Sequence, residues 1–352
     1  MEKVRVKTRY SYDVLIGNDL TEETVSRISG NCKKTVLLWD EAVFSGYVAE
    51  IGNALEADGK EVMAISLEGG ENAKTIESYS KIMKIMSDFN ITRSDAVFGI
   101  GGGTVMDLAG FIASTYKRGV ALVQLPTTLL AACDASVGGK NALNIGDEKN
   151  VVGTFYQPDL VVIDTRFLSA LSDEVFSEGC AEIIKMGFLG DKDMIAELEK
   201  KSLLKNRGDE DYLVRIIKRC IEIKAAIVET DERDHGPRNI LNLGHTLGHA
   251  IEAESNYKIH HGQAVAMGMV QMTRIAENKG IADIGTLGRL ITLLAEHGLE
   301  WRCPYNINVL AGHVERDKKV RGGSLPIIVP EKFGSCVLMK LKIDDIKKWL
   351  TE

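Results

Sequence analysis

The chain has 352 residues, of which 45% are hydrophobic and 26% charged, and its net charge of -7 is spread along the sequence. This composition is that of a soluble globular protein with room for two domains, and the acidic balance argues against nucleic acid as a partner. No window reaches the ~18 uninterrupted apolar residues of a membrane span, and six widely separated cysteines without a CxxC pair favour a reducing cytoplasm.

The first part of the chain alternates short β-branched segments with amphipathic ones, which predicts a mainly parallel sheet. Strands are expected at residues 35–39, 61–67, 96–100, 121–125 and 160–163, and helices at 43–57, 75–90 and 105–116. Beyond residue 164 the pattern becomes mostly helical, at 212–230, 240–254, 262–279 and 285–298. The predicted boundary lies near residues 165–175, where Ser172 is a plausible N-cap.

A glycine-rich turn follows the third predicted strand. The run Gly101-Gly102-Gly103-Thr104 lies between that strand and a helix start, so bare backbone amides and a positive helix terminus meet where a pyrophosphate docks. Asp40, at the end of the strand 35–39, is a candidate ribose or adenine partner. The spacing departs from GxGxxG, and a tight turn without a ligand is the alternative interpretation.

A second polar cluster spans residues 127–150 and carries Lys140 after two glycines, which let a ligand approach the backbone. Lysine suits phosphates and carboxylates, so Lys140 together with Lys185, Lys224 and Arg238 indicates an anionic substrate. The alternative for any one of these residues is a solvated surface position.

Three histidines and one glutamate have the spacing of a metal site. His245 and His249 are four residues apart, so on a helix both imidazoles project from one face. His261 comes from a second element, and Glu182, in an apolar helical stretch, is the best carboxylate candidate. A divalent cation open to substrate needs about three protein ligands. The alternative is a pair of structural helix histidines.

Several longer motifs follow one another in order over nearly the whole chain, and with them the chain resembles the 3-dehydroquinate synthase family. They are GGGTVMDLAGF (101–111), TYKRG (115–119), LPTTLLA (125–131), DASVGGK (134–140), AEIIK (181–185), RNILNLGHTLGHAIE (238–252), HGQAVAMGM (261–269) and DKK (317–319).

The resemblance implies a Rossmann-like NAD-binding α/β domain over residues 1–168, an all-α metal- and substrate-binding domain over 169–352, a homodimer, and Zn²⁺ or Co²⁺ as the metal. It implies that 3-deoxy-D-arabino-heptulosonate 7-phosphate becomes 3-dehydroquinate and phosphate, in the shikimate pathway to aromatic amino acids. The steps would be transient oxidation by NAD, phosphate elimination, reduction and intramolecular aldol closure.

The resemblance also implies roles for individual residues. Spacing alone would make His249 a ligand, whereas the resemblance makes it a catalytic, phosphate-side residue and gives the metal to Glu182, His245 and His261. The implied NAD contacts are Glu71, Lys74, Gly102, Gly103, Asp107, Thr127, Thr128 and Lys149, beside Asp40 and Thr104 from the turn itself. The implied substrate contacts are Asp134, Lys140, Asn150, Lys185, Lys224, Arg238, Asn242 and Lys318 or Lys319, with Arg118 reaching the phosphate from the partner subunit.

Two positions depart from the family pattern: Asn141 replaces the usual threonine after Gly-Gly-Lys, and Gln263 the usual glutamate after His-Gly. Related cyclases act on sedoheptulose 7-phosphate or glucose 6-phosphate, and they are the first alternative. A metal-dependent polyol dehydrogenase would instead release NADH and would have no use for phosphate-binding Lys140, Lys149 and Arg118. A catalytically silent NAD-binding regulator would turn over none of these substrates.

Overall fold

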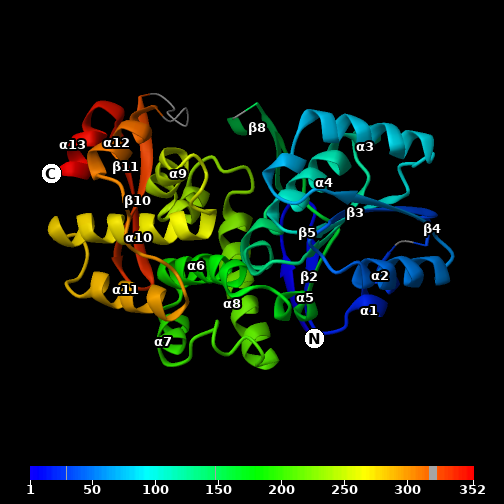
Figure 1. Ribbon diagram of the computed structural model, residues 1–352, viewed down its shortest axis with the longest axis horizontal. Helices are drawn as coiled ribbons and strands as arrows, with labels where there is room; N and C mark the ends of the chain where they lie inside the picture. Colours follow the sequence, from blue (N-terminus) through cyan, green and yellow to red (C-terminus); the bar gives the residue numbers. More distant parts are fainter. Residues whose placement is uncertain (29, 147, 317–322) are drawn as a thin grey trace. The chain divides into compact units, whose positions relative to one another are not determined.

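The computed structural model describes residues 1–28, 30–146, 148–316 and 323–352. The chain divides into two compact units, residues 1–171 with 210–233 and residues 172–209 with 234–352 (Figure 1). The predicted single boundary near residue 168 differs in one respect, because helix α8 (Glu210–Thr230) belongs to the first unit. Among the residues described, we find no helix with the length and apolar character needed to cross a membrane.

In the described part of the chain, seven strands of the first unit form one sheet in the order β1-β2-β9-β6-β5-β3-β4. All neighbouring pairs are parallel except β1 with β2. The five predicted strands are confirmed, whereas the first two were not predicted. The bounds are β1 (Glu2–Val6), β2 (Tyr12–Gly17), β3 (Lys34–Asp40), β4 (Glu61–Leu67), β5 (Ala96–Gly101), β6 (Ala121–Pro126) and β9 (Leu160–Asp164).

Alternation along the strands explains why both faces of this sheet are covered. In β3, Val36 and Leu38 enter one apolar core and Leu37 the other. Helices α3 and α4 cover the first face and α1 and α2 the second (Figure 1). The other elements of this unit are α1 (Thr21–Ser26), α2 (Ser45–Ala57), η1 (Glu71–Ala73), α3 (Ile76–Asp88), α4 (Gly103–Thr115), η2 (Tyr116–Arg118), η3 (Ala131–Ala135), α5 (Thr165–Ser169) and a hairpin of β7 (Lys140–Ile145) and β8 (Glu148–Phe155).

The direction in which the chain adds strands across the sheet changes between β3 and β5, although the two strands are parallel. From β3 the chain moves outward to β4, then returns past β3 to β5 and continues to β6 and β9. In open α/β sheets, ligands bind at the carboxyl ends of the strands at such a switch point. Asp40 and the glycine turn therefore lie where the topology favours a ligand.

The second unit is mostly helical, as predicted, and it also contains one β-hairpin that was not predicted. Its hairpin, β10 (Ser324–Lys332) with β11 (Ser335–Lys342), packs its apolar side chains into a core shared with α9, α10, α12 and α13. The helical elements are α6 (Asp173–Gly190), α7 (Lys192–Lys200), η4 (Pro237–Asn242), α9 (His245–Glu254), α10 (His261–Asn278), α11 (Thr286–Glu296), α12 (Ile307–Arg316) and α13 (Ile343–Thr351).

The helix predicted over residues 240–254 is broken before His245. Gly244 adopts the left-handed conformation with φ 78° and precedes the first residue of α9. A Cβ there would lie 2.6 Å from Cγ of Met269 and 2.8 Å from the carbonyl oxygen of Val265. Only glycine combines this conformation with this close approach to α10. His245 is consequently placed in the first turn of its helix.

Buried His297 joins the end of α11 to the segment after α7. Its Nε2 accepts from the backbone N–H of Leu203 at 3.0 Å, and its Nδ1 lies 2.8 Å from the carbonyl oxygen of Leu293. This pairing needs a neutral ring with its proton on Nδ1. Burial lowers the pKa of His297, while Glu296 and Lys205 act on it in opposite directions.

We predict that His297 makes the fold sensitive to mild acid. Below the ordinary histidine pKa of about 6.5 the unfolded chain takes up a proton that the folded ring excludes, so stability is lost as the pH falls, by at most about 1.4 kcal/mol per pH unit. Urea unfolding at about pH 7.5 and 5.5 should show this loss. The variant His297→Gln should lose less stability between the two pH values, and an equal loss would contradict the assignment.

Candidate functional site

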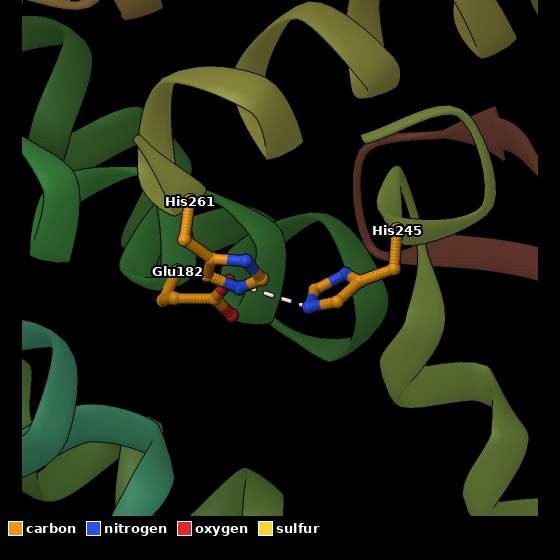
Figure 2. Close-up of side chains that lie close together, drawn as sticks. All are labelled: Glu182, His245 and His261. Carbon is orange, nitrogen blue, oxygen red and sulfur yellow. Dashed lines mark ion pairs between the residues drawn. The ribbon is translucent and has the colours of Figure 1, made fainter. Parts of the chain in front are cut away.

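Three helices of the second unit each contribute one donor to a common point. Glu182 lies inside α6, and His245 and His261 are the first residues of α9 and α10. The Nε2 atoms of His245 and His261 lie 3.6 and 3.7 Å from Oε1 of Glu182. One ligand atom from each residue lies within 4.8 Å of the others, and Figure 2 shows the three side chains converging. The structure thus brings the three predicted metal ligands together.

In both histidine rings, the nitrogen that faces away from Glu182 has an oxygen partner. Nδ1 of His245 is 3.1 Å from the carbonyl oxygen of Leu243, and Nδ1 of His261 is 3.4 Å from Oε2 of Glu252. An oxygen acceptor at Nδ1 keeps the proton there and leaves the Nε2 lone pair for a cation, as is usual around metal-binding histidines. Sequence reasoning missed Glu252, although it lies two helical turns after His245 on the same face of α9.

The charges around the cluster favour a cation. Glu182 is fully buried and forms an ion pair with Lys185. Burial, reinforced by Lys185, lowers the pKa of His245 to about 3, so its ring is neutral as a ligand must be. For His261, burial is outweighed by the carboxylates of Glu182 and Glu252, which raise its pKa to about 10. The surroundings of His261 therefore attract positive charge.

Two imidazoles and one carboxylate are a donor set that Zn²⁺ accepts in catalytic sites, with a position left for substrate. A second possible group, His249 with Glu252 and His261, shares one residue with the first. Because Nδ1 of His261 already faces Glu252, its Nε2 is directed to Glu182. His249 lies beside this set, its ring centre 5.6 Å from that of His245.

In the first unit, the structure brings together several residues predicted to contact NAD or substrate. Lys74 pairs with Asp107 and donates to Oδ1 of Asn150. Asn144, which sequence reasoning missed, donates to Oε2 of Glu71 at 2.6 Å and accepts from the backbone N–H of Asn150 at 2.9 Å. Asn150 is held with φ 57°, in the left-handed region. A polar network thus links η1, α4 and the β7–β8 hairpin.

The predicted nucleotide-binding residues follow the carboxyl ends of β3, β5 and β6. The Cβ of Asp40 approaches the turn at Gly101, and Thr127 donates its backbone N–H to the carbonyl oxygen of Gly101 at 2.8 Å. Thr128 lies against Gly102, the residue that precedes α4. Gly103 and Thr104 form the first turn of α4, whereas Lys149 lies apart in sequence, on β8.

The remaining predicted substrate residues are divided between the units. In the first, Lys224 of α8 pairs with Asp134 of η3, and Lys140 and Arg118 are exposed. In the second, Lys185 and Arg238 are buried and Asn242 ends η4. Lys318 and Lys319 lie outside the described residues.

Both departures from the family pattern have structural roles. Asn141 is buried, and its Nδ2 donates to the carbonyl oxygens of Gly139 at 2.9 Å and Tyr156 at 3.1 Å. Its side chain fills the space above Gly110 of α4, where a Cβ would lie 1.7 Å from its Oδ1. Gln263 accepts from the backbone N–H of Glu300 at 2.8 Å. Through its hydrogen bond to Gly139, Asn141 therefore fixes the turn that precedes Lys140.

Known proteins resemble this chain in sequence over nearly its whole length. The sequence profile described as "3-dehydroquinate synthase N-terminal" matches residues 64–178, and the one described as "3-dehydroquinate synthase C-terminal" matches residues 179–320. A 3-dehydroquinate synthase of Enterococcus faecalis (strain ATCC 47077 / OG1RF) is 38% identical over 97% of this chain and 96% of its own length. One from Clostridium beijerinckii is 40% identical over 95% and 96%.

A solved structure has the same fold. A 2-deoxy-scyllo-inosose synthase complexed with carbaglucose-6-phosphate, NAD⁺ and Co²⁺ superposes with a TM-score of 0.89 at 25% identity, covering 99% of both chains. The chain thus has the fold of a sugar phosphate cyclase over its whole length. Within that class, the chain belongs to the 3-dehydroquinate synthase family.

We predict that Asn141→Thr, which restores the usual family residue, leaves the choice among sugar phosphates unchanged. The buried carbonyls of Gly139 and Tyr156 lose a shared donor, so the free energy of unfolding should fall by about 1–3 kcal/mol. Urea unfolding measures the stability. Relative rates with the heptulosonate 7-phosphate, sedoheptulose 7-phosphate and glucose 6-phosphate measure the substrate preference. A changed order of substrates would make Asn141 a specificity residue.

Proposed function

We propose that this chain is a phosphorus–oxygen lyase that converts 3-deoxy-D-arabino-heptulosonate 7-phosphate to 3-dehydroquinate and phosphate, in the shikimate pathway of the cytoplasm. The observation that carries the proposal is the convergence of Glu182, His245 and His261 in a member of this family. Six free thiols agree with a reducing compartment.

NAD is the proposed cofactor of the first unit. Support comes from Asp40, the glycine turn and Thr128 at the switch point, and from the NAD⁺ named with the related inosose synthase. When bound, NAD would supply the oxidation of the substrate hydroxyl at carbon 5 to a ketone, which acidifies the neighbouring C–H for phosphate elimination, and afterwards the reduction that returns the hydride. Lys74 and Asp107 would neutralise one another while their network orders Asn150.

Zn²⁺ or Co²⁺ is the proposed metal, held by Glu182, His245 and His261. When bound, it supplies Lewis acidity that makes a substrate hydroxyl easier to deprotonate. Lys185 forms an ion pair with Glu182, and Leu243 and Glu252 orient the two imidazoles. Zinc suits two imidazoles and a carboxylate, and Co²⁺ is named with the related cyclase.

The remaining polar residues of the chain would bind the substrate and move its protons. Lys140, Lys224 and Arg238 carry the positive charge that a phosphorylated sugar acid requires. His249 stands beside the ligand set on α9 without belonging to it, so one of its ring nitrogens is suited to exchange a proton with the departing phosphate. Asp134, Asn150 and Asn242 would hydrogen-bond the hydroxyl groups, and Lys318 the carboxylate.

We also propose a homodimer in which Arg118 reaches the phosphate bound by the partner. The β7–β8 hairpin exposes the apolar side chains of Ile145, Val151, Val152 and Phe155. Apolar side chains gathered on one element are typical of a surface that another subunit covers.

Phosphate release tests the proposed reaction. Phosphate release by metal-loaded protein with catalytic NAD should occur with the heptulosonate 7-phosphate and without net NADH, since the reduction returns the hydride. Parallel assays with sedoheptulose 7-phosphate and glucose 6-phosphate test the other cyclases. Release from one of those sugars alone would identify a related cyclase. Net NADH from a polyol would identify a dehydrogenase, and bound NAD without any turnover a silent binder.

Substitution of Lys140 tests its proposed role in substrate binding. Lys140→Ala should remove one charge-assisted contact worth about 1.5–3 kcal/mol and so raise KM roughly 10- to 150-fold, while the Kd for NAD stays unchanged. Steady-state kinetics and NAD titration measure the two effects. Lys81→Ala, an exposed lysine of α3, is the matched control. Unchanged kinetics for the Lys140 variant would remove this residue from the site.

A further inference from the structure

Helix α10 begins at a proposed metal ligand but has no cap of its own. His261 is its first residue, and the preceding His260 makes no side-chain capping hydrogen bond. The first N–H groups of a helix lack intrahelical acceptors and need partners from elsewhere. One partner comes from α6, because Oε2 of Glu178 accepts from the backbone N–H of Gly262 at 3.4 Å.

The second oxygen of the same carboxylate lies close to the residue on the other side of His261. Oε1 of Glu178 lies 3.0 Å from Nδ1 of His260. Glu178 therefore contacts both chain neighbours of His261 and leaves the His261 ring to face Glu182. A carboxylate at this place is also favoured by the positive end of the α10 dipole.

Glu178 and Glu182 are one helical turn apart on α6, so they project from the same face. One carboxylate meets the ring of His261 and the other the backbone that carries it. The contacts of Glu178 thus help to set the 3.7 Å separation between Nε2 of His261 and Oε1 of Glu182.

The backbones of α6 and α10 meet at this point without an intervening side chain. A Cβ on Gly262 would lie 2.5 Å from both Cα and the carbonyl oxygen of Glu178. Any larger residue would push α10 away from α6, and its first residue with it. The side chain of Glu178 is 14% exposed, whereas that of Glu174, 4.0 Å from Nδ1 of His260, is 72% exposed. Of the two carboxylates near His260, that of Glu178 is therefore the one fixed by its surroundings, whereas that of Glu174 lies in solvent.

We propose that Glu178 is a positioning residue for the metal centre: it fixes the start of α10 on α6 and so presents His261 to the cation held with Glu182. This inference rests on the proposed metal site. It assigns Glu178 no contact with metal or substrate.

Metal titration of chelator-treated protein tests the inference. Glu178→Ala should bind Zn²⁺ about 10- to 100-fold more weakly, as is typical when a residue that orients a ligand is lost. The visible absorption of bound Co²⁺ should change as well, because His261 is displaced. Glu178→Gln keeps an oxygen that accepts from Gly262 and should recover most of the affinity. Glu174→Ala, the matched control, should bind like the wild type.

The outcomes separate this inference from the proposed function. Failure of the wild-type protein to bind Zn²⁺ or Co²⁺ would overturn the metal site itself. Wild-type affinity and an unchanged Co²⁺ spectrum in Glu178→Ala would overturn the inference alone, even if its unfolding temperature fell. Should Glu178→Ala not fold, Glu178→Asp replaces it, since its shorter side chain withdraws the carboxylate from Gly262. Weaker metal binding by the Asp variant supports the inference, and unchanged binding overturns it.

Discussion

The burial of one carboxylate inside α6 is the constraint on which the second unit depends. Glu182 is wholly removed from solvent, and an isolated charge there would be strongly unfavourable. Lys185, on the same helix, compensates the charge of Glu182 in an ion pair. His245 and His261 come from two further helices that begin beside Glu182. The break at Gly244 and the contact at Gly262 place those two helix starts. The positions of Glu182, His245 and His261 therefore depend both on helix packing and on compensation of the buried charge.

The sequence predicts much of the first unit because its strands are strongly apolar and bounded by glycine and polar residues. Strands β1 and β2 were missed: β1 alternates charged with apolar residues at the sheet edge and pairs antiparallel to β2. The β7–β8 hairpin lies in a polar, glycine-containing stretch that indicates a loop. In the second unit, the hairpin β10–β11 follows the helices and gains its stability from their core, which local periodicity does not reveal.

The site shows a similar division between local and tertiary information. Helical spacing places His245 and His249 on one face of α9, but it does not tell a ligand from a neighbour. The structure separates them because Nδ1 of His245 faces the carbonyl oxygen of Leu243 while its Nε2 faces Glu182 from a distant helix. Asn144 and Glu252 were missed because their importance lies in partners far away along the chain or across a loop. Asn141 is the converse case: its departure from the family pattern suggests a role in specificity, yet its side chain faces α4.

Helix α8 has a consequence for how the protein is made. It belongs to the first unit, packs against β1 and β2, and carries Lys224, although residues 172–209 of the second unit precede it in the chain. During synthesis from the N-terminus, the sheet can assemble once β9 has emerged, but β1 and β2 lack their contacts with α8 until residue 230 has left the ribosome. By then α6, with Glu182, is already outside and awaits α9 and α10. Neither unit is therefore one continuous stretch of nascent chain, and the first part of the second unit is synthesised before the first unit is complete.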